Sequence, residues 1–226
     1  MYKKVTKIMN KSPQNIQNMF NLIANNYDKL NSIISFGFNN IIKSACIKSL
    51  HINPNEKVLD LCTGTGDLIK FIKKYSNNVT GVDFSENMLK IARKKFKDTE
   101  FIEADCTQLP FDDNSFDIIT MGYGLRNIEN RTKALQEVYR VLKPNGKFLH
   151  LDFGEKNFAG KIFETAVMNL IKFFTENTSS YYYLVKSKQD FPNPKELINE
   201  TETCHFKLLK RLDYLFKAIS AQIYTK

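Results

Sequence analysis

Short apolar runs alternate with helical patterns between residues 57 and 153, and this alternation restricts the chain to few folds. Strands that alternate with helices in this way favour a doubly wound, mainly parallel α/β sheet. Helical periodicity predicts a helix over 67–75, a second helix that begins after an N-cap at Ser85, and a third over 131–142. A turn is expected at KPNG (143–146). The expected strands are KVLDLCT (57–63), NVTGVD (78–83), TEFIEAD (99–105), FDIITMGYG (116–124) and KFLHLDF (147–153).

The predicted sheet also indicates where a ligand binds. Ligands of doubly wound sheets bind outside the carboxyl ends of the strands, near the switch in strand order. This rule brings together the 63–67 loop, Asp83, Asp105 and the 122–127 stretch. We therefore expect one site at this edge.

The stretch VLDLCTGTGD (58–67) places two glycines directly after the first strand. A phosphate-binding P-loop needs Lys and Ser/Thr after its last glycine, whereas Asp67 follows Gly66 here. A dinucleotide fingerprint needs a third glycine, and that position is Ile69. A pyrophosphate would also meet the like charge of Asp67. S-adenosylmethionine is a sulfonium without phosphate, so an acidic loop suits it.

Two acidic residues at later strand ends support the same ligand. A carboxylate at Asp83 can accept hydrogen bonds from both ribose hydroxyls, as it would for NAD. Alternatively Asp83 caps the next helix, although Ser85 already offers a cap. Asp105 can accept from the adenine amine while Leu109 and Phe111 cover the ring, or it is an ordinary loop acid. Together with the glycine loop, these acids favour S-adenosylmethionine as cofactor.

Length and composition predict one soluble domain. The 226 residues are 42% hydrophobic, enough for one sizeable core. The four cysteines form no CxxC pair and the three histidines stand apart, so we expect a reducing compartment and no metal site. The expected parts of the domain (1–226) are an N-terminal helical cap (1–50), a cofactor-binding core (51–153) and an acceptor-side lid with the last strands (154–226).

The formal net charge of +9 raises the question of an anionic partner. Nucleic acid and anionic membranes both attract basic proteins, but a lysine-rich solvated surface gives the same charge. No dense Lys/Arg run appears, so we expect no nucleic-acid partner. No apolar run approaches 18 residues and the N-terminal segment lacks an apolar core, so neither a transmembrane helix nor a secretory signal is expected.

Several stretches together resemble the ubiquinone/menaquinone biosynthesis C-methyltransferase family. The TGTGD loop is shared by many methyltransferases, whereas the Y-D-x-x-N-x-x-x-S-x-G pattern within 27–37 and GLRN (124–127) are specific to this family. The resemblance runs from about residue 19 to the end of the chain. The matching stretches are MFNLIANNYDKLNSIISFG (19–37), VLDLCTGTGDL (58–68), GVDFSENML (81–89), ADCTQLPFDDNSFD (104–117), YGLRN (123–127), YRVLKPNG (139–146) and SYYYLVKSKQDFP (180–192).

The resemblance implies a class I, Rossmann-like S-adenosylmethionine-dependent methyltransferase with N-terminal helices and a helical insertion near the C-terminus. The implied reaction is C-methylation of a prenylated quinol in menaquinone or ubiquinone biosynthesis. Alternatives are a phylloquinone-type quinone, another small acceptor such as a sterol, amine or phenol, or a non-catalytic cofactor-binding subunit of a quinone-synthesis complex. The implied location is the cytoplasm or the inner face of a membrane, or an organelle matrix in a eukaryote, and a homodimer is an open expectation.

The resemblance also indicates site residues. Thr65, Asp83 and the Asp105–Cys106 pair match family cofactor contacts, and Gly122 stands where the family often has a serine. In the KPNG turn Asn145 replaces a usual glycine, which asparagine's tolerance of positive φ permits. The full set of expected cofactor-binding residues is Asp60, Thr63, Gly64, Thr65, Gly66, Asp83, Phe84, Met88, Asp105, Cys106 and Gly122.

On the acceptor side, the implied chemistry needs a stabilised phenolate. A neutral aromatic carbon is a poor nucleophile, and deprotonation of the neighbouring hydroxyl gives the ortho carbon carbanion character. Arg126 is expected to stabilise that oxyanion, unless it forms a structural salt bridge, and Asn127 to orient a water or ring oxygen. Tyr27 and Asp28 are expected to close over the ring, with helix packing as the alternative for Tyr27.

The stretch KIFETAVMNLIKFF (161–174) has a helical pattern of apolar residues. Most such faces are core. Because a long isoprenoid tail must also be housed, this stretch is a candidate lid or membrane contact, and the lysine excess would favour an anionic bilayer.

Overall fold

The computed structural model describes residues 12–34, 38–156, 183, 187, 188 and 190–226. Its described part is built around one seven-stranded sheet with the order β3-β2-β1-β4-β5-β7-β6. The strands are β1 (Val58–Leu61), β2 (Val79–Asp83), β3 (Glu100–Glu103), β4 (Phe116–Gly122), β5 (Leu142–Phe153), β6 (Lys207–Tyr214) and β7 (Ile219–Thr225).

The first five strands are parallel, and β7 and then β6 continue the sheet in antiparallel pairing. The strand order reverses between β1 and β4: the chain continues from β1 to β2 on one side of this point and from β4 to β5 on the other. A crevice for a ligand is expected at this switch point. The predicted doubly wound, mainly parallel α/β sheet is therefore confirmed.

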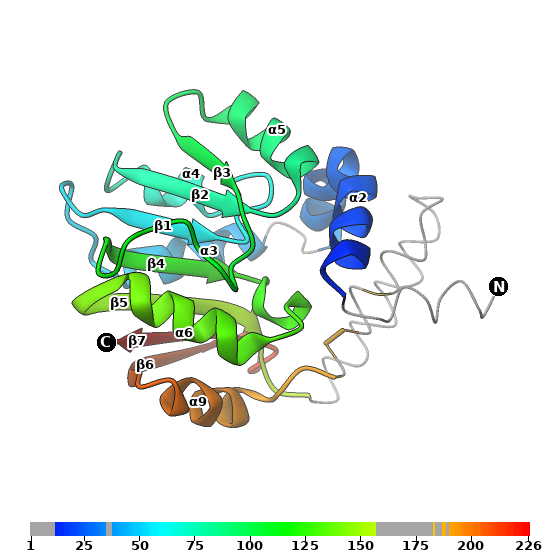
Figure 1. The fold of residues 1–226 in the computed structure, drawn as a ribbon. Helices are drawn as coiled ribbons and strands as arrows, with labels where there is room; N and C mark the ends of the chain where they lie inside the picture. Colours follow the sequence, from blue (N-terminus) through cyan, green and yellow to red (C-terminus); the bar gives the residue numbers. More distant parts are fainter. Residues whose placement is uncertain (1–11, 35–37, 157–182, 184–186, 189) are drawn as a thin grey trace.

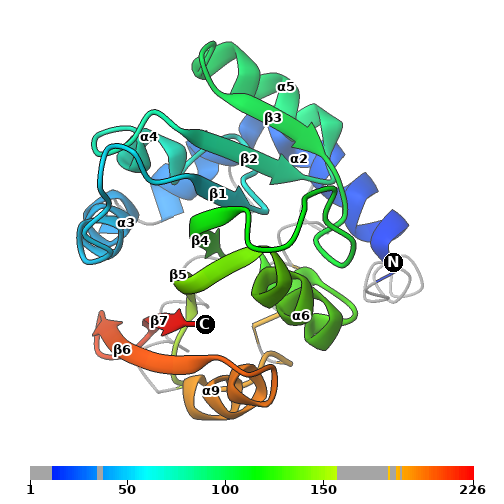
Figure 2. The same cartoon turned by 60° about the vertical axis from the view of Figure 1, so that its left-hand side comes forward.

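Helices cover both faces of the sheet. Buried side chains of α3, α4 and α5 share one apolar cluster with the sheet, and those of α6 and α9 share another. Figure 2 shows α6 and α9 on the side of the sheet opposite α3 and α4. The helices are α2 (Pro13–Ile34), α3 (Phe38–Lys48), α4 (Ile69–Ile72), α5 (Glu86–Lys95), α6 (Arg131–Val141) and α9 (Pro194–Thr203), with a 3₁₀ turn η1 at Leu125–Asn127.

This two-sided covering explains the continuous apolar runs of the sequence. All four residues of β1 are buried, with Val58 in the first cluster and Leu59 and Leu61 in the second. A parallel strand buried on both faces cannot alternate apolar with polar residues. Burial of an aliphatic side chain contributes roughly 1.5–3 kcal/mol, so such strands form the stable frame of the site.

Two local predictions differ from the structure. The helix expected over 67–75 is only one α-turn, α4, because the flanking residues close i→i+3 bonds such as Phe71 N to Leu68 O. The KPNG segment lies inside β5 as an irregularity, where the partners of Phe116 and Ile118 jump from Leu142 to Lys147. Asn145 has φ 63° there, a left-handed conformation that asparagine tolerates, as expected from the sequence.

Helix α2 lies beyond the carboxyl ends of the parallel strands, beside α5 (Figure 1). Ile16 and Met19 of this helix form a small apolar cluster with Tyr183, against which Phe84 packs. The N-terminal segment therefore covers part of the edge at which a ligand is expected. None of the helices in the described ranges has the length and apolarity to cross a bilayer.

Candidate cofactor and acceptor site

The loop after β1 turns by means of three left-handed residues, Cys62 (φ 52°), Gly64 (φ 57°) and Gly66 (φ 82°). A Cβ on Gly64 would meet no atom within 4 Å, whereas one on Gly66 would lie 2.7 Å from the ring of Phe96. Gly66 is therefore required by packing inside the protein. Gly64 instead leaves open space beside the backbone, where a ligand can approach closely.

Asp83 connects the end of β2 to this loop. Its carboxylate accepts the backbone N–H of Gly64 at 2.8 Å and that of Ser85 at 2.9 Å. Burial raises the pKa of Asp83 to about 6, although these backbone hydrogen bonds oppose the shift. A carboxylate has about four lone-pair sites, so two remain for hydroxyl donors of a ligand. Ser85, not Asp83, caps α5 by accepting the N–H of Met88, as predicted.

Asp60 and Thr63 hold the loop from inside. The hydroxyls of Thr63 and Thr120 each donate to one carboxylate oxygen of Asp60 at 2.6 Å. Burial raises the pKa of Asp60 to about 7, and the two hydroxyl donors moderate this rise. Both carboxylate oxygens of Asp60 accept hydrogen bonds inside the core, so Asp60 stabilises the loop through Thr63.

Asp67 forms ion pairs with two lysines. It contacts the ammonium of buried Lys43 and lies 2.9 Å from Lys70 Nζ. Burial opposes ionisation, but these two cations keep the pKa of Asp67 below its ordinary value. The negative charge of Asp67 is therefore neutralised by Lys43 and Lys70. The negative charge that remains next to the glycine loop comes from Asp83, not from Asp67 as the sequence indicated.

The segment after β3 carries the predicted Asp105–Cys106 pair. Asp105 is exposed and accepts the N–H of Thr107 at 2.8 Å, whereas Cys106 is buried with its sulfur 3.6 Å from that of Cys62. The hydrogen bond with Cys106 and burial raise the pKa of Cys62, so it remains a thiol at neutral pH. The carboxylate of Asp105 thus faces outward beside the glycine loop, with the thiols packed beneath.

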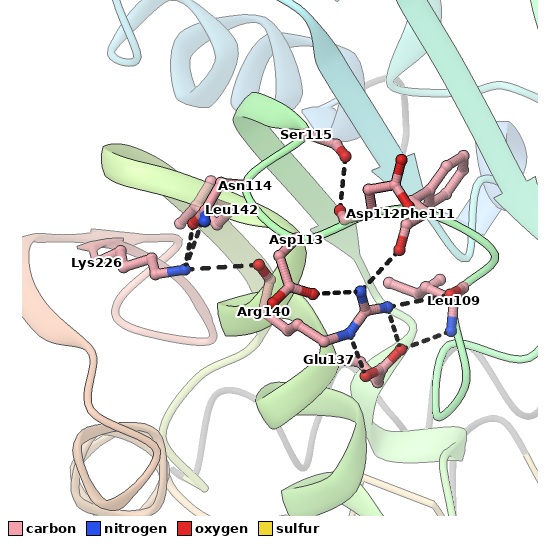
Figure 3. Close-up of polar contacts among 10 residues, drawn as sticks. All are labelled: Leu109, Phe111, Asp112, Asp113, Asn114, Ser115, Glu137, Arg140, Leu142 and Lys226. Carbon is pink, nitrogen blue, oxygen red and sulfur yellow. Dashed lines mark hydrogen bonds and ion pairs between the residues drawn. The ribbon is translucent and has the colours of Figure 1, made fainter.

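Arg140 of α6 fixes the following loop, residues 109–115 (Figure 3). Its guanidinium donates to the carbonyls of Leu109 and Phe111 and to the carboxylates of Asp113 and Glu137. Glu137 also accepts the N–H of Leu109 at 2.7 Å. This fork-shaped network holds Leu109 and Phe111, the residues expected to cover an adenine ring, in a fixed position.

Helix α2 is tied to the site by polar contacts. Asp28 accepts the hydroxyl of Thr65 at 2.5 Å and pairs with Lys95 of α5. Gln17 donates to the carbonyl of Phe84, and the Ser85 hydroxyl lies 2.6 Å from the Asn21 amide oxygen. Asp28 thus contacts the glycine loop directly, and its expected closure over an acceptor ring stays a prediction.

Arg126 lies in η1, next to the carboxyl end of β5. Its Nη1 lies 3.1 Å from Asp152 Oδ1 and 2.7 Å from the carbonyl of Tyr123, and Nε donates to Ser187 at 3.2 Å. The side chain is only 5% exposed. The salt bridge considered from the sequence is therefore present. It holds a fixed positive charge near the edge where oxyanion stabilisation was expected.

The other predicted residues take different positions. Asn127 is buried beside Arg126 and donates to the carbonyl of Tyr123 at 3.3 Å. Gly122 ends β4, where a Cβ would lie 3.0 Å from Leu68 Cδ1. Met88 is buried in α5, and Tyr27 packs edge-on with Phe20 at 6.2 Å between ring centroids. Ligand-contact roles for these residues stay predictions.

The comparison with protein families shows which family this chain belongs to. The model of the ubiE/COQ5 methyltransferase family matches residues 7–226. The chain belongs to the ubiE/COQ5 methyltransferase family. The resemblance predicted from YDKLN and GLRN is thereby confirmed, and the chain is an S-adenosylmethionine-dependent methyltransferase.

Curated relatives of the family cover most of the chain. A demethylmenaquinone methyltransferase of Thermotoga maritima is 38% identical over 198 residues, 83% of this chain and 86% of its own. One from Lactococcus lactis is 36% identical over 209 residues, covering 86% and 82% of the two chains. The family match over residues 7–226 includes α2 and the last strands as well as the glycine loop.

Solved structures support the fold. A SAM-dependent methyltransferase from Thermotoga maritima has a TM-score of 0.69 at 22% identity and covers 92% of this chain and 99% of its own. The [4+2]-cyclase SpnF has a TM-score of 0.70 at 13% identity and covers 95% and 96%. Because a cyclase shares the shape, the fold by itself does not define the chemistry.

The residues present fit S-adenosylmethionine. Open space lies before Gly64, and the carboxylates of Asp83 and Asp105 end neighbouring strands beside it. Acceptor oxygens of this kind suit the ribose hydroxyls and the adenine amine, which are hydrogen-bond donors. The loop itself has neither the lysine of a P-loop nor the third glycine of a dinucleotide fingerprint.

Sequence reasoning missed three residues that shape the site. Asp152 pairs with Arg126, Lys43 neutralises Asp67, and Tyr123 adopts φ 57° with its hydroxyl 3.1 Å from Asn39 Oδ1. Asp152 was detectable, because it is an acid at the end of a parallel strand, as Asp83 is. Tyr123 follows β4 within the 122–127 stretch already expected at this edge, whereas Lys43 has no such local signal, since only the packing of α3 brings it to the loop.

Proposed function

We propose that this chain methylates a ring carbon of a prenylated quinol in quinone biosynthesis, with demethylmenaquinol as the first candidate acceptor. The similarity to demethylmenaquinone methyltransferases over more than four-fifths of the chain supports this proposal. The structural observation that carries it is the buried Arg126–Asp152 pair at the carboxyl end of β5. A corresponding ubiquinone precursor or a phylloquinone-type quinol are the other acceptors of the same class.

The cofactor-side residues would hold S-adenosylmethionine at the carboxyl edge of β1, β2 and β3. Asp83 would accept the ribose hydroxyls, Asp105 the adenine amine, and the Gly64 backbone would lie against the ligand. When bound, S-adenosylmethionine supplies an electrophilic methyl group on its sulfonium. Helix α2, anchored through Asp28 and Gln17, would exclude water from this edge.

On the acceptor side, the protein supplies a fixed charge. The guanidinium of Arg126 is held by Asp152, Tyr123 and Ser187, so its charge is already oriented before a phenolate develops. A preorganised donor of this kind is typically worth a factor of about 10²–10³ in kcat. Asn127, buried next to it, would orient a ring oxygen.

We also propose a peripheral membrane contact, since a prenylated quinol is delivered from a bilayer. The β6–β7 turn lies at the carboxyl end of β5, where Phe153 pairs with Ile219. Phe216 in this turn is 89% exposed and is followed by Lys217. An apolar tip beside basic residues suits an anionic lipid surface. The helical stretch predicted for this role, 161–174, lies outside the described residues.

The test is an incubation of the purified chain with methyl-labelled S-adenosylmethionine and demethylated prenylated naphthoquinols and benzoquinols. The expected result is label on a ring carbon of the naphthoquinol, identified by mass spectrometry of the lipid. The same compounds in their oxidised form are the matched control, because a quinone has no hydroxyl to ionise. Cofactor binding without transfer to any prenylated quinol would contradict the proposal.

A further inference from the structure

A group of buried polar atoms beside Arg126 lacks hydrogen-bond partners. Among the described residues, five buried side-chain atoms form no hydrogen bond. An unpartnered buried donor or acceptor costs about 1–3 kcal/mol, so such a concentration calls for an explanation. The five atoms are Asn127 Oδ1, His150 Nε2, Asp152 Oδ2, Tyr183 OH and Ser220 Oγ.

Two of these atoms face each other at the end of β5. His150 and Asp152 are two residues apart on one strand, so their side chains share a face of the sheet. The distance between His150 Nε2 and Asp152 Oδ2 is 3.9 Å. The other carboxylate oxygen, Oδ1, lies 3.1 Å from Arg126 Nη1. Asp152 therefore lies between the guanidinium and the imidazole.

The surroundings of His150 leave Nε2 as an acceptor. Burial lowers the pKa of His150, against the opposing influence of Asp152, so the imidazole is neutral at pH 7. Gln222 of β7, opposite His150, contributes a hydrogen bond, which falls on Nδ1 because Nε2 has none. The other charges that act on His150 are Arg126 of η1 and Glu200 of α9. A neutral imidazole with its proton on Nδ1 presents a bare lone pair at Nε2.

The carboxylate and the imidazole are thus two facing acceptors, and the hydroxyl of Ser220, which lies opposite Asp152 on β7, donates to neither of them. One proton would satisfy both, because a protonated carboxyl donates to an imidazole nitrogen. We propose that Asp152 accepts the hydroxyl proton of the quinol at Oδ2 and that His150 Nε2 then receives a hydrogen bond from this new carboxyl proton. The inference rests on the proposed function. Asp152 becomes a catalytic base, and His150 is a positioning residue that acts through it.

The proton step balances in atoms, electrons and charge. The quinol O–H bond breaks and its electron pair stays on the ring oxygen, while an O–H bond forms at Asp152 Oδ2. Arg126 exchanges a carboxylate partner for a phenolate partner, so the buried group keeps the same net charge. Because no additional charge is created in a low-dielectric site, the step avoids the desolvation cost of an isolated ion.

The experiment compares Asp152→Asn and His150→Phe with the wild-type enzyme, using a demethylated prenylated naphthoquinol kept reduced. For Asp152→Asn we expect kcat to fall by about 10²-fold or more, the usual contribution of a general base. For His150→Phe we expect a fall of roughly tenfold, with the quinol KM and the cofactor dissociation constant unchanged. In both variants the pH dependence of kcat should change.

Stability separates a catalytic from a packing role. Phenylalanine fits the aromatic surroundings of His150, whose ring centroid lies 6.4 Å from that of Phe148 and 6.2 Å from that of Phe191. His150→Phe loses the Nδ1 hydrogen bond to Gln222 but no bond at Nε2, so the melting temperature should fall by a few degrees at most while turnover falls. His150→Gln, which keeps an acceptor, should recover part of kcat. Thr201→Val, an isosteric loss of a buried hydroxyl in α9, should behave as wild type.

Each outcome decides one question. Wild-type kcat in both Asp152→Asn and His150→Phe would overturn the inference and leave the proposed function intact. Equal losses in His150→Phe and His150→Gln, with lowered melting temperatures, would assign His150 to packing and overturn its part. Absence of quinol methylation by the wild-type enzyme would instead overturn the proposed function on which the inference rests.

Discussion

At the scale of single residues, the two glycines of the cofactor loop have different tasks. Both adopt positive φ, but Gly66 packs against Phe96 whereas Gly64 borders open space. The sequence motif treats them as equivalent. The structure separates a glycine required for folding from one required for ligand approach.

The pair allows a matched test. Gly66→Ala combines left-handed strain of about 1–2 kcal/mol with a contact 2.7 Å from Phe96, so we expect it to lower the melting temperature by several degrees. Gly64→Ala carries only the strain, so it should be more stable than Gly66→Ala. Its cofactor dissociation constant should nevertheless rise about tenfold, since a methyl group occupies the approach space. Differential scanning calorimetry and titration calorimetry measure the two effects, and unaltered binding in Gly64→Ala would contradict the assignment.

Asp83 provides a pH-dependent prediction. Its pKa in the folded protein is about 6, above the ordinary 3.8, so the carboxyl is protonated below pH 6 and ionised above it. Ionisation of this buried group opposes folding, and the resulting loss of stability sets in as pH rises from about 4 to 6. Ligand hydroxyls donate to the carboxylate form, so cofactor affinity should increase several-fold between pH 5 and 7.

The control for this prediction is Asp83→Asn, in which the pH-dependent part of the affinity should disappear. Asp60, whose pKa is raised to about 7, titrates in the same range but remains present in this variant. Titration calorimetry at several pH values separates the two contributions. A pH dependence unchanged in Asp83→Asn would remove Asp83 from the binding role.

At the scale of elements, the site depends on neighbours that hold loops in place. Helix α2 is fixed to the glycine loop through Asp28 and Thr65, and α6 fixes the 109–115 loop through Arg140 (Figure 3). Neither helix belongs to the glycine loop itself. Loops that bind ligands are usually positioned by a rigid scaffold in this way.

Arg140→Lys tests this positioning. Lysine keeps the charge but not the fork of donors that reaches the carbonyls of Leu109 and Phe111. We expect faster amide exchange in 109–115 and a several-fold weaker affinity for S-adenosylmethionine, with kcat at saturation unchanged. Arg131→Lys, on the same helix but paired with Glu200, is the control and should leave affinity unchanged. Equal effects of the two variants would contradict the role of Arg140.

At the scale of the whole molecule, net charge and one exposed aromatic residue are the basis of the proposed lipid contact. The chain carries a formal net charge of +9, and the exposed Phe216 lies in the turn that adjoins the end of β5. Electrostatic attraction brings such a protein to an anionic bilayer, and apolar insertion retains it there.

Vesicle flotation tests this prediction. We expect binding to vesicles that contain anionic lipid. This binding should decrease strongly between 0.05 and 0.5 M salt, because the screening length becomes roughly threefold shorter. Phe216→Ser should weaken binding several-fold, whereas Leu22→Ser, at an exposed position of α2, should have little effect. Salt-independent flotation, or none at all, would contradict the proposed contact.

The fold was largely predictable from the sequence because its signals are local. Strand β1 is an apolar run because both faces of a parallel strand are buried, and Ser85 caps α5 as its position indicated. The length of α4 was not predictable, since i→i+3 bonds replace the α-helical pattern around it. Periodicity shows which side a residue faces but not how tightly the turn is wound.

The sequence by itself determined the α/β fold class, the glycine loop, the acids at strand ends and the family. Each of these is carried by short stretches of neighbouring residues. Only the tertiary structure decided how charges are paired, as in Arg126 with Asp152, Asp67 with Lys43, and His150 beside Asp152. These pairs join different elements or depend on side-chain direction, and no local pattern encodes them. A buried charge is defined by its partner, and partners are brought together only when the chain folds.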